Sequence, residues 1–190
     1  MFEYLMPLLH MRSYENTLLD RGARGAVIIQ QLYARERGLP WGISEAAYGA
    51  RDERMQYQYR AFGVPPLSAT AHKADRIVVA PYASMLALML DPGQATANLR
   101  FLATRGCLSR HGFCESIEYP AGGQSPELIR CFMSHHQGMG LLGIDNALFG
   151  ERMQERFHLD PLVQATEFLL QERMPALVEV LDESGDVAAA

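Results

Sequence analysis

Apolar residues recur at helical spacing along most of this chain. Positions three and four residues apart are apolar over stretches long enough to form one buried helix face each. The pattern predicts helices over residues 1–11, 16–37, 81–90, 92–105, 126–149 and 161–173, with a break at Gly150 within 144–158. Pro7 interrupts the first stretch. Helices therefore dominate the predicted fold.

Local signals mark where several of these helices begin and end. Asp91-Pro92, Ser125-Pro126 and Asp160-Pro161 each place a capping side chain before a proline that suits the first helical turn. Gly38 and Gly106 follow predicted helices, where a glycine commonly ends the last turn. These signals agree with the apolar period.

Three segments lack the helical period. Residues 39–44 and 59–74 are rich in proline, glycine, serine and alanine, and read as loops. Residues 110–119 alternate like a short strand, with Phe113, Glu115, Ile117 and Tyr119 on one face. The predicted class is all-α, with a short β element near residues 110–119.

Composition indicates a globular chain of 190 residues, with 48% hydrophobic and 21% charged residues. The net charge of −5 argues against a nucleic-acid partner, whose binders carry a basic face. No apolar run suits a membrane span, and the first residues lack the features of a signal peptide, so we expect a cytoplasmic location. We expect one domain over 1–175 and a flexible tail over 176–190.

The three cysteines do not form a recognisable motif. Cys107, Cys114 and Cys131 are odd in number and lack Cys-x-x-Cys spacing, which disfavours a disulfide framework or a zinc site. We expect free, mostly buried thiols in a reducing compartment. No metal and no cofactor is predicted.

The segment from Pro40 to Asp52 carries the most chemical information. It holds the only tryptophan, Trp41, with Glu45 four residues later. Sugars stack their C–H faces on aromatic rings and offer hydroxyls to charged partners. Nearby polar and aromatic residues that suit a sugar site are Arg51, Asp52, Tyr57 and Tyr59.

Hydrolysis of a glycosidic bond needs a second carboxyl group, and Glu115 is the candidate. Alternation puts it on an apolar face, where a lone charge is costly unless it is paired or its pKa rises. The alternative is a structural glutamate that pairs with Arg110 or reaches water. Glu45 follows Ser44, which is placed to cap a short helix through Ala50; a carboxylate there would be kept ionised for a structural or a nucleophilic role.

His135 and His136 are predicted in the middle of a helix, on faces shared with apolar residues. Neighbouring histidines diverge by about 100°, a poor geometry for one metal, so they indicate a pocket lining or satisfied core side chains. Residues 138–143 match Gly-x-Gly-x-x-Gly, but no strand precedes them. We therefore expect no nucleotide, and we expect the glycines to allow close approach of a helix or ligand.

Taken together, these motifs resemble the central glycoamylase-like region of cyclic β-1,2-glucan synthases. The segments that carry the resemblance lie at 14–20, 38–45, 57–59, 77–82, 112–116, 132–139 and 157–175. The resemblance implies part of an (α/α)6 barrel, with about half of its twelve helices. One position departs from the family pattern, since Cys114 stands where an aromatic residue is expected.

The resemblance also implies a substrate and a reaction. The substrate would be β-1,2-glucan, and the reaction a retaining transglycosylation that closes a linear chain into a ring. Glu45 and Glu115 would be the catalytic acids. Trp41, Arg51, Asp52, Tyr57, Tyr59, His135 and His136 would line the cleft. The alternatives are an endo-β-1,2-glucanase-like hydrolase and a truncated, inactive glucan-binding or helical interaction module, with a homodimer or missing parent domains completing the structure.

Overall fold

The computed structural model describes residues 1–67, 76–120 and 125–173. The helices are α1 (Phe2–Leu5), α2 (Leu18–Glu36), α3 (Pro81–Ala87), α4 (Pro92–Thr104), α5 (Ser134–Phe149), α6 (Arg152–Phe157) and α7 (Pro161–Thr166), with 3-10 turns η1 (Met6–Leu9), η2 (Pro65–Leu67) and η3 (Glu167–Gln171). The strands are β1 (Ala46–Arg51), β2 (Tyr57–Arg60), β3 (Arg76–Val79), β4 (Leu108–Ser109), β5 (Gly112–Phe113), β6 (Ser116–Pro120) and β7 (Glu127–Ile129).

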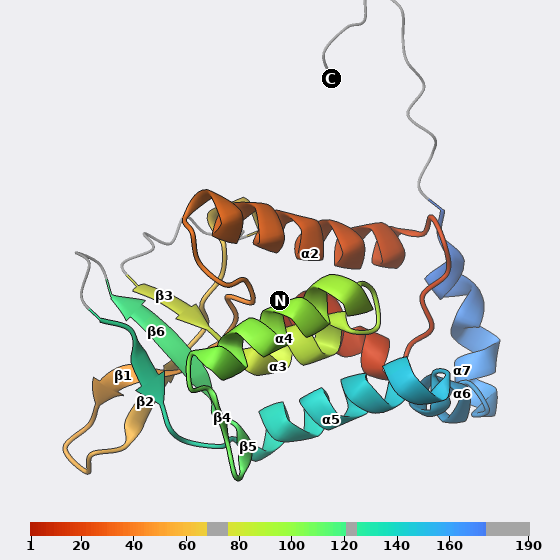
Figure 1. Ribbon diagram of the computed structural model, residues 1–190. Coiled ribbons are helices and arrows are strands. Elements are labelled where there is room, and N and C mark those ends of the chain that lie inside the picture. The colour runs from red at the N-terminus through yellow and green to blue at the C-terminus, as the bar shows by residue number, and fades with distance from the viewer. Residues whose placement is uncertain (68–75, 121–124, 174–190) are drawn as a thin grey trace, which may run out of the picture.

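The helices lie in a stack, with the strands at one end (Figure 1). Helix α3 packs against both α4 and α5. The strands form an antiparallel β1–β2 pair, an antiparallel sheet in the order β3-β6-β7, and a β4–β5 pair. Helices α6 and α7 lie at the other end (Figure 1). The described chain is thus mainly helical, but the all-α expectation was too narrow.

The predicted start and end of α4 and the predicted start of α7 are confirmed to within one residue. The Asp91 carboxylate accepts a hydrogen bond from the Gln94 N–H at 3.1 Å, and Asp160 caps α7 in the same way. Gly106 follows α4 with φ of +85°, and Gly150 ends α5 with φ of +70°. The C-terminal helix is shorter than expected, because α7 ends at Thr166 and continues as η3.

The predicted helix through residues 46–50 was wrong, because this segment is strand β1. Alanines favour a helix locally. Here the β1 backbone pairs with β2, with Ala47 opposite Tyr59. The Ala47 and Gly49 N–H groups donate to side-chain carboxylates of Glu115 and Glu118, at 3.2 and 2.7 Å. These long-range partners outweigh the local preference.

The predicted helix start at Pro126 was also wrong. Residues Glu127–Ile129 form β7 and pair with β6, and the helix begins at Ser134. His135 and His136 therefore lie in the first turn of α5 rather than in its middle. Their side chains consequently stand near the strand end of the molecule, where the candidate chemistry is.

The expected strand over 110–119 is divided. Residues 108–113 form the short β4–β5 pair, and β6 begins at Ser116. Cys114 and Glu115 lie between these strands. Part of the expected 59–74 loop belongs to β2, while 68–74 and the predicted 176–190 tail lie outside the described residues.

The glycines of α5 allow the close helix contact that the sequence predicts. A Cβ atom on Gly143 would lie 2.8 Å from the Met85 backbone oxygen, and one on Gly140 would lie 2.5 Å from the Met85 sulfur. Helix α3 therefore approaches α5 through the space that side chains would otherwise fill. This contact fixes how the first turn of α5 faces α3.

Candidate active site

Glu115 is buried at the point where β5 gives way to β6, with 2% of its surface exposed. Its backbone N–H donates to the Cys131 oxygen at 3.0 Å. Its Oε1 atom accepts hydrogen bonds from the Ala47 N–H at 3.2 Å and from His136 Nδ1 at 2.8 Å. The Glu115 Oε2 atom has no hydrogen-bond partner within the described parts of the chain. The inward-facing Glu115 is confirmed, but its partner is His136 rather than Arg110.

His136 is held between aromatic rings. Its ring stacks on Tyr82 of α3, with centroids 3.8 Å apart and an interplanar angle of 14°. Tyr59 of β2 lies near it, with centroids 5.9 Å apart and an angle of 30°. The His135 ring lies 4.0 Å from that of His136. Burial, followed by the neighbouring His136, lowers the pKa of His135, which favours its neutral form.

Tyr82 is itself fixed by hydrogen bonds, although the sequence reasoning did not name it as a site residue. Its hydroxyl donates to the Glu45 backbone oxygen at 3.0 Å and lies 2.7 Å from Ser44 Oγ. Because the single phenolic proton goes to the carbonyl, Ser44 is the donor to Tyr82. Burial raises the pKa of Tyr82, so the phenol stays neutral. The sequence signal that could have identified Tyr82 is an aromatic residue in the first turn of a helix that follows a strand.

Tyr59 connects the two carboxylates. Its hydroxyl donates to Glu45 Oε1 at 2.5 Å and lies 3.3 Å from His136 Nε2. It also lies 3.4 Å from His135 Nε2. Burial, and then the hydrogen bond to Glu45, raises the pKa of Tyr59, which keeps the phenolic proton in place. We call the connected group the carboxylate network; it consists of Glu45, Tyr59, His136 and Glu115.

All four members of this network are among the site residues predicted from the sequence. They come from widely separated segments of the chain. Glu45 is half-buried just before β1, whereas Glu115 is fully buried before β6. Two carboxyl groups in different environments can hold a proton to different extents. One can therefore donate a proton while the other remains an anion that attacks or stabilises positive charge.

Comparison with known proteins places the chain in a family. A family model described as "Putative glucoamylase" (Glycoamylase) matches residues 1–161. The chain belongs to this glycoamylase family.

Two further proteins are similar over nearly the whole chain. The cyclic beta-(1,2)-glucan synthase NdvB of Rhizobium meliloti (strain 1021) is 40% identical over 185 residues, which cover 95% of this chain and 6% of that protein. The crystal structure of a beta-1,2-glucanase from Parabacteroides distasonis shares the fold, with a TM-score of 0.61 and 17% identity, over 90% of this chain and 24% of the glucanase. The chain therefore spans only a small part of either protein.

Trp41, one of the predicted site residues, lies outside the carboxylate network. It is buried, and its backbone N–H and carbonyl both bond to the Asn98 side chain, at 3.3 and 2.8 Å. It lines a cavity of about 340 Å³ with Pro40, Gln94 and Phe101, among others. None of the carboxylate network's residues lines that cavity.

Arg51, Asp52 and Tyr57 lie together where the β1–β2 hairpin turns. The Tyr57 hydroxyl accepts a 3.0 Å hydrogen bond from Arg51, whose guanidinium also lies over the Tyr57 ring. The exposed Asp52 carboxylate accepts from the N–H groups of Arg54 and Gln56, both at 2.9 Å, and so shapes the turn. These side chains stabilise the hairpin and leave polar groups at its surface.

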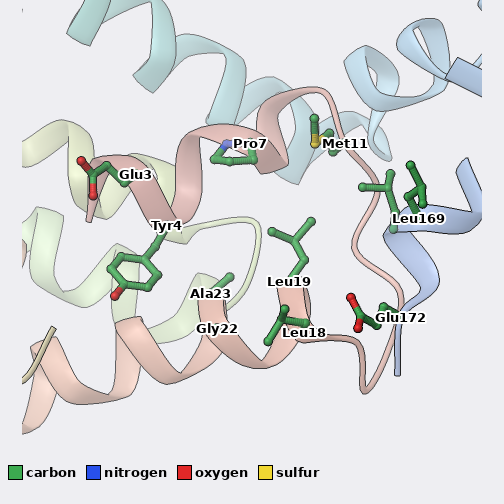
Figure 2. A pocket seen from close by; sticks show the side chains of 11 residues that line it. Glu3, Tyr4, Pro7, Met11, Leu18, Leu19, Gly22, Ala23, Leu169 and Glu172 are labelled. Carbon is green, nitrogen blue, oxygen red and sulfur yellow. The ribbon is translucent and has the colours of Figure 1, made fainter. Parts of the chain in front are cut away.

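A larger cavity of about 500 Å³ lies elsewhere, between α1, η1, α2 and η3 (Figure 2). Its wall is mostly apolar and includes Tyr4, Pro7, Leu19 and Leu169. None of the predicted site residues lines it. An apolar wall suits packing against another apolar surface better than it suits a sugar.

The described residues contain no group of three or more histidine, cysteine, aspartate or glutamate side chains placed to hold a metal. Cys107 and Cys114 are free and buried, as the sequence predicts, and Cys131 is free and half-buried. In the same described ranges, no helix has the length and apolar character that crossing a membrane requires.

Proposed function

We propose that this chain carries the catalytic carboxylates of a domain that transfers glucosyl units of β-1,2-glucan and closes linear chains into rings. The observation that carries the proposal is the network in which Tyr59 and His136 connect Glu45 to Glu115. The similarity to a cyclic β-1,2-glucan synthase and to a β-1,2-glucanase supports the choice of substrate.

In the proposed reaction, one carboxyl group protonates the leaving glycosidic oxygen while the other attacks the anomeric carbon. A sugar hydroxyl then displaces the enzyme carboxylate and gives its proton back to the first group, which retains the anomeric configuration. Ring closure needs that hydroxyl to belong to the same glucan chain. His135 lies beside the network and is proposed to contact the sugar, together with Arg51, Asp52 and Tyr57 from the hairpin. Trp41 would contribute only if the substrate reaches its separate cavity.

We further propose that residues 1–175 form part of an (α/α)6 barrel. The fold likeness covers 90% of this chain but only 24% of the glucanase, as expected of a partial domain. Exposed apolar side chains on α2 and α5 support a covering layer, from parent domains or from a second copy; these are Leu18, Ile28, Leu32, Leu141, Leu148 and Phe149. The cytoplasmic location stays a prediction.

The test is incubation with linear β-1,2-glucan, followed by mass spectrometry of the products. Cyclic products support transglycosylation. Shorter linear products favour hydrolysis, the second candidate, which the similarity to a glucanase supports. Absence of any product, with glucan binding that survives Glu115→Gln, contradicts both and indicates a binding module.

A further inference from the structure

Three hydrogen-bond contacts connect the carboxylates in series. They join Glu45 to Tyr59 at 2.5 Å, Tyr59 to His136 Nε2 at 3.3 Å, and His136 Nδ1 to Glu115 at 2.8 Å. Every hydrogen bond contains one proton, so three contacts need three protons if each is to be a bond.

The side chains do not supply three protons when both carboxylates are ionised and His136 is neutral. Tyr59 has one O–H, which goes to Glu45, and neutral His136 has one N–H, which goes to Glu115. The Tyr59 oxygen and His136 Nε2 then face each other with lone pairs and no proton between them. This arrangement is unfavourable for His136, because its ring is buried and Nε2 would lack a hydrogen bond.

One additional proton satisfies all three contacts. It can reside on Nε2, which makes His136 an imidazolium, or on Glu45, whose O–H then donates to Tyr59 while Tyr59 donates to Nε2. In either case the network carries a net charge of −1. The additional proton can therefore move between His136 and Glu45 without any change in the number of hydrogen bonds.

Other titratable groups face the network. His135 comes from α5, Tyr82 from α3, and Cys131 from the segment before α5. The Arg60 guanidinium in β2 lies over the Tyr48 and Phe62 rings. Tyr82 gives its proton to the Glu45 backbone, so it is not a link in the series.

We propose that Tyr59 and His136 form a proton relay that passes one shared proton between Glu45 and Glu115. The proton of Glu45 moves to the Tyr59 oxygen as the Tyr59 proton moves to His136 Nε2 and the Nδ1 proton moves to Glu115. Only O–H and N–H bonds form and break, and the net charge stays constant. His136 ends as the opposite tautomer.

The relay deepens the proposed glucosyl transfer and rests on it for its purpose. In that reaction the acid must hold a proton while the nucleophile is an anion, and the relay lets the one shared proton settle on the acid before each transfer. Tyr59 is 40% exposed, so water can reach the space that its hydroxyl leaves. Tyr59→Phe should therefore remove the relay and leave the fold intact.

The relay is tested by ¹⁵N nuclear magnetic resonance of the His136 ring in the full chain, without substrate. In Glu45→Gln, the amide donates to Tyr59, which turns its proton toward His136. In the wild type the relay places the shared proton on Glu45 only part of the time, so Nε2 is protonated for the remainder. In Glu45→Gln we therefore expect the Nε2 resonance to move toward the non-protonated position. In the Tyr59→Phe background, the same Glu45→Gln change should leave the His136 resonances where they were. Tyr57→Phe, the same substitution two residues away, is the control background and should preserve the full response.

An equal response with and without the Tyr59 hydroxyl would show interaction through space and overturn the relay, as would no response in either. Circular dichroism and thermal melting of each variant verify folding. A wild-type chain that turns over no glucan contradicts the proposed function, but the resonance experiment still decides the relay. If the chain is active, Tyr59→Phe should lower kcat/KM about 10²-fold or more, as expected for loss of acid–base assistance.

Discussion

Glu115 and Glu118 lie three residues apart and are equally buried, at 2% exposure, yet their surroundings differ. Both oxygens of Glu118 are occupied, because Oε1 accepts from Arg76 at 2.6 Å and Oε2 from the Gly49 N–H at 2.7 Å. Glu115 has His136 and Ala47 at one oxygen, while its other oxygen has no partner in the described ranges. A fully satisfied carboxylate with an arginine indicates a structural role, whereas a spare oxygen beside a histidine indicates chemistry.

The largest expected difference is in activity. Glu115→Gln should lower kcat on linear β-1,2-glucan at least about 10²-fold, because it removes an acid–base or nucleophilic group while preserving shape. Glu118→Gln should change kcat far less. Rates of product formation by the two variants, together with their melting curves, measure this difference in kcat. Equal losses of kcat in both variants would contradict the difference between Glu115 and Glu118.

Removal of the Arg76 guanidinium beside Glu118 should lower the stability of the chain rather than its kcat. Arg76→Met leaves a buried carboxylate with one partner fewer, at a cost of about 1–3 kcal/mol in the free energy of unfolding. Urea denaturation measures this cost. Arg24→Met is a matched control, because Arg24 pairs with the buried Asp20 away from β6. If Arg76→Met lowered kcat without lowering stability, Glu118 would have a catalytic role rather than a structural one.

A smaller change at Gly49 should also affect only the Glu118 side. A Cβ atom there would lie 2.9 Å from Glu118 Oε2 and 2.5 Å from Glu127 Oε2. The exposed Glu127 can turn away, but Glu118 is held by Arg76, so we expect Gly49→Ala to cost about 1–3 kcal/mol. Calorimetry measures it. Gly138→Ala, with open space around the new methyl, should instead stabilise the chain by about 0.5–1 kcal/mol.

The smallest expected effect is a pH dependence on the Glu115 side. The pKa of His135 is lowered from 6.5 by burial and by His136, so the unfolded chain binds its proton more readily. The stability associated with neutral His135 is present above pH 6.5 and is lost as the pH falls through the lower folded value. His135→Gln should flatten this part of the stability curve, measured by denaturation between pH 5 and pH 7.5. A steeper curve in the variant would contradict this assignment.

Local signals predicted much of the helical part. The caps at Asp91 and Asp160 depend on neighbours within a few residues, so sequence reasoning could place them. Strands β1 and β7 were missed because their partners, β2 and β6, lie outside the local pattern. The alternation correctly indicated a buried Glu115, but it could not reveal the approach of His136 or the stacking of Tyr82.

The scattered origin of the carboxylate network has a consequence for folding kinetics. Its members lie just before β1, in β2, just before β6 and in α5, so contacts within the site join residues far apart in the sequence. The loops between these residues must close before any such contact compensates for the loss of chain entropy. Helices such as α2 and α4 depend on nearby residues and can form early. Recovery of the His136–Glu115 contact should therefore lag behind recovery of helical signal when the unfolded chain is returned to native conditions.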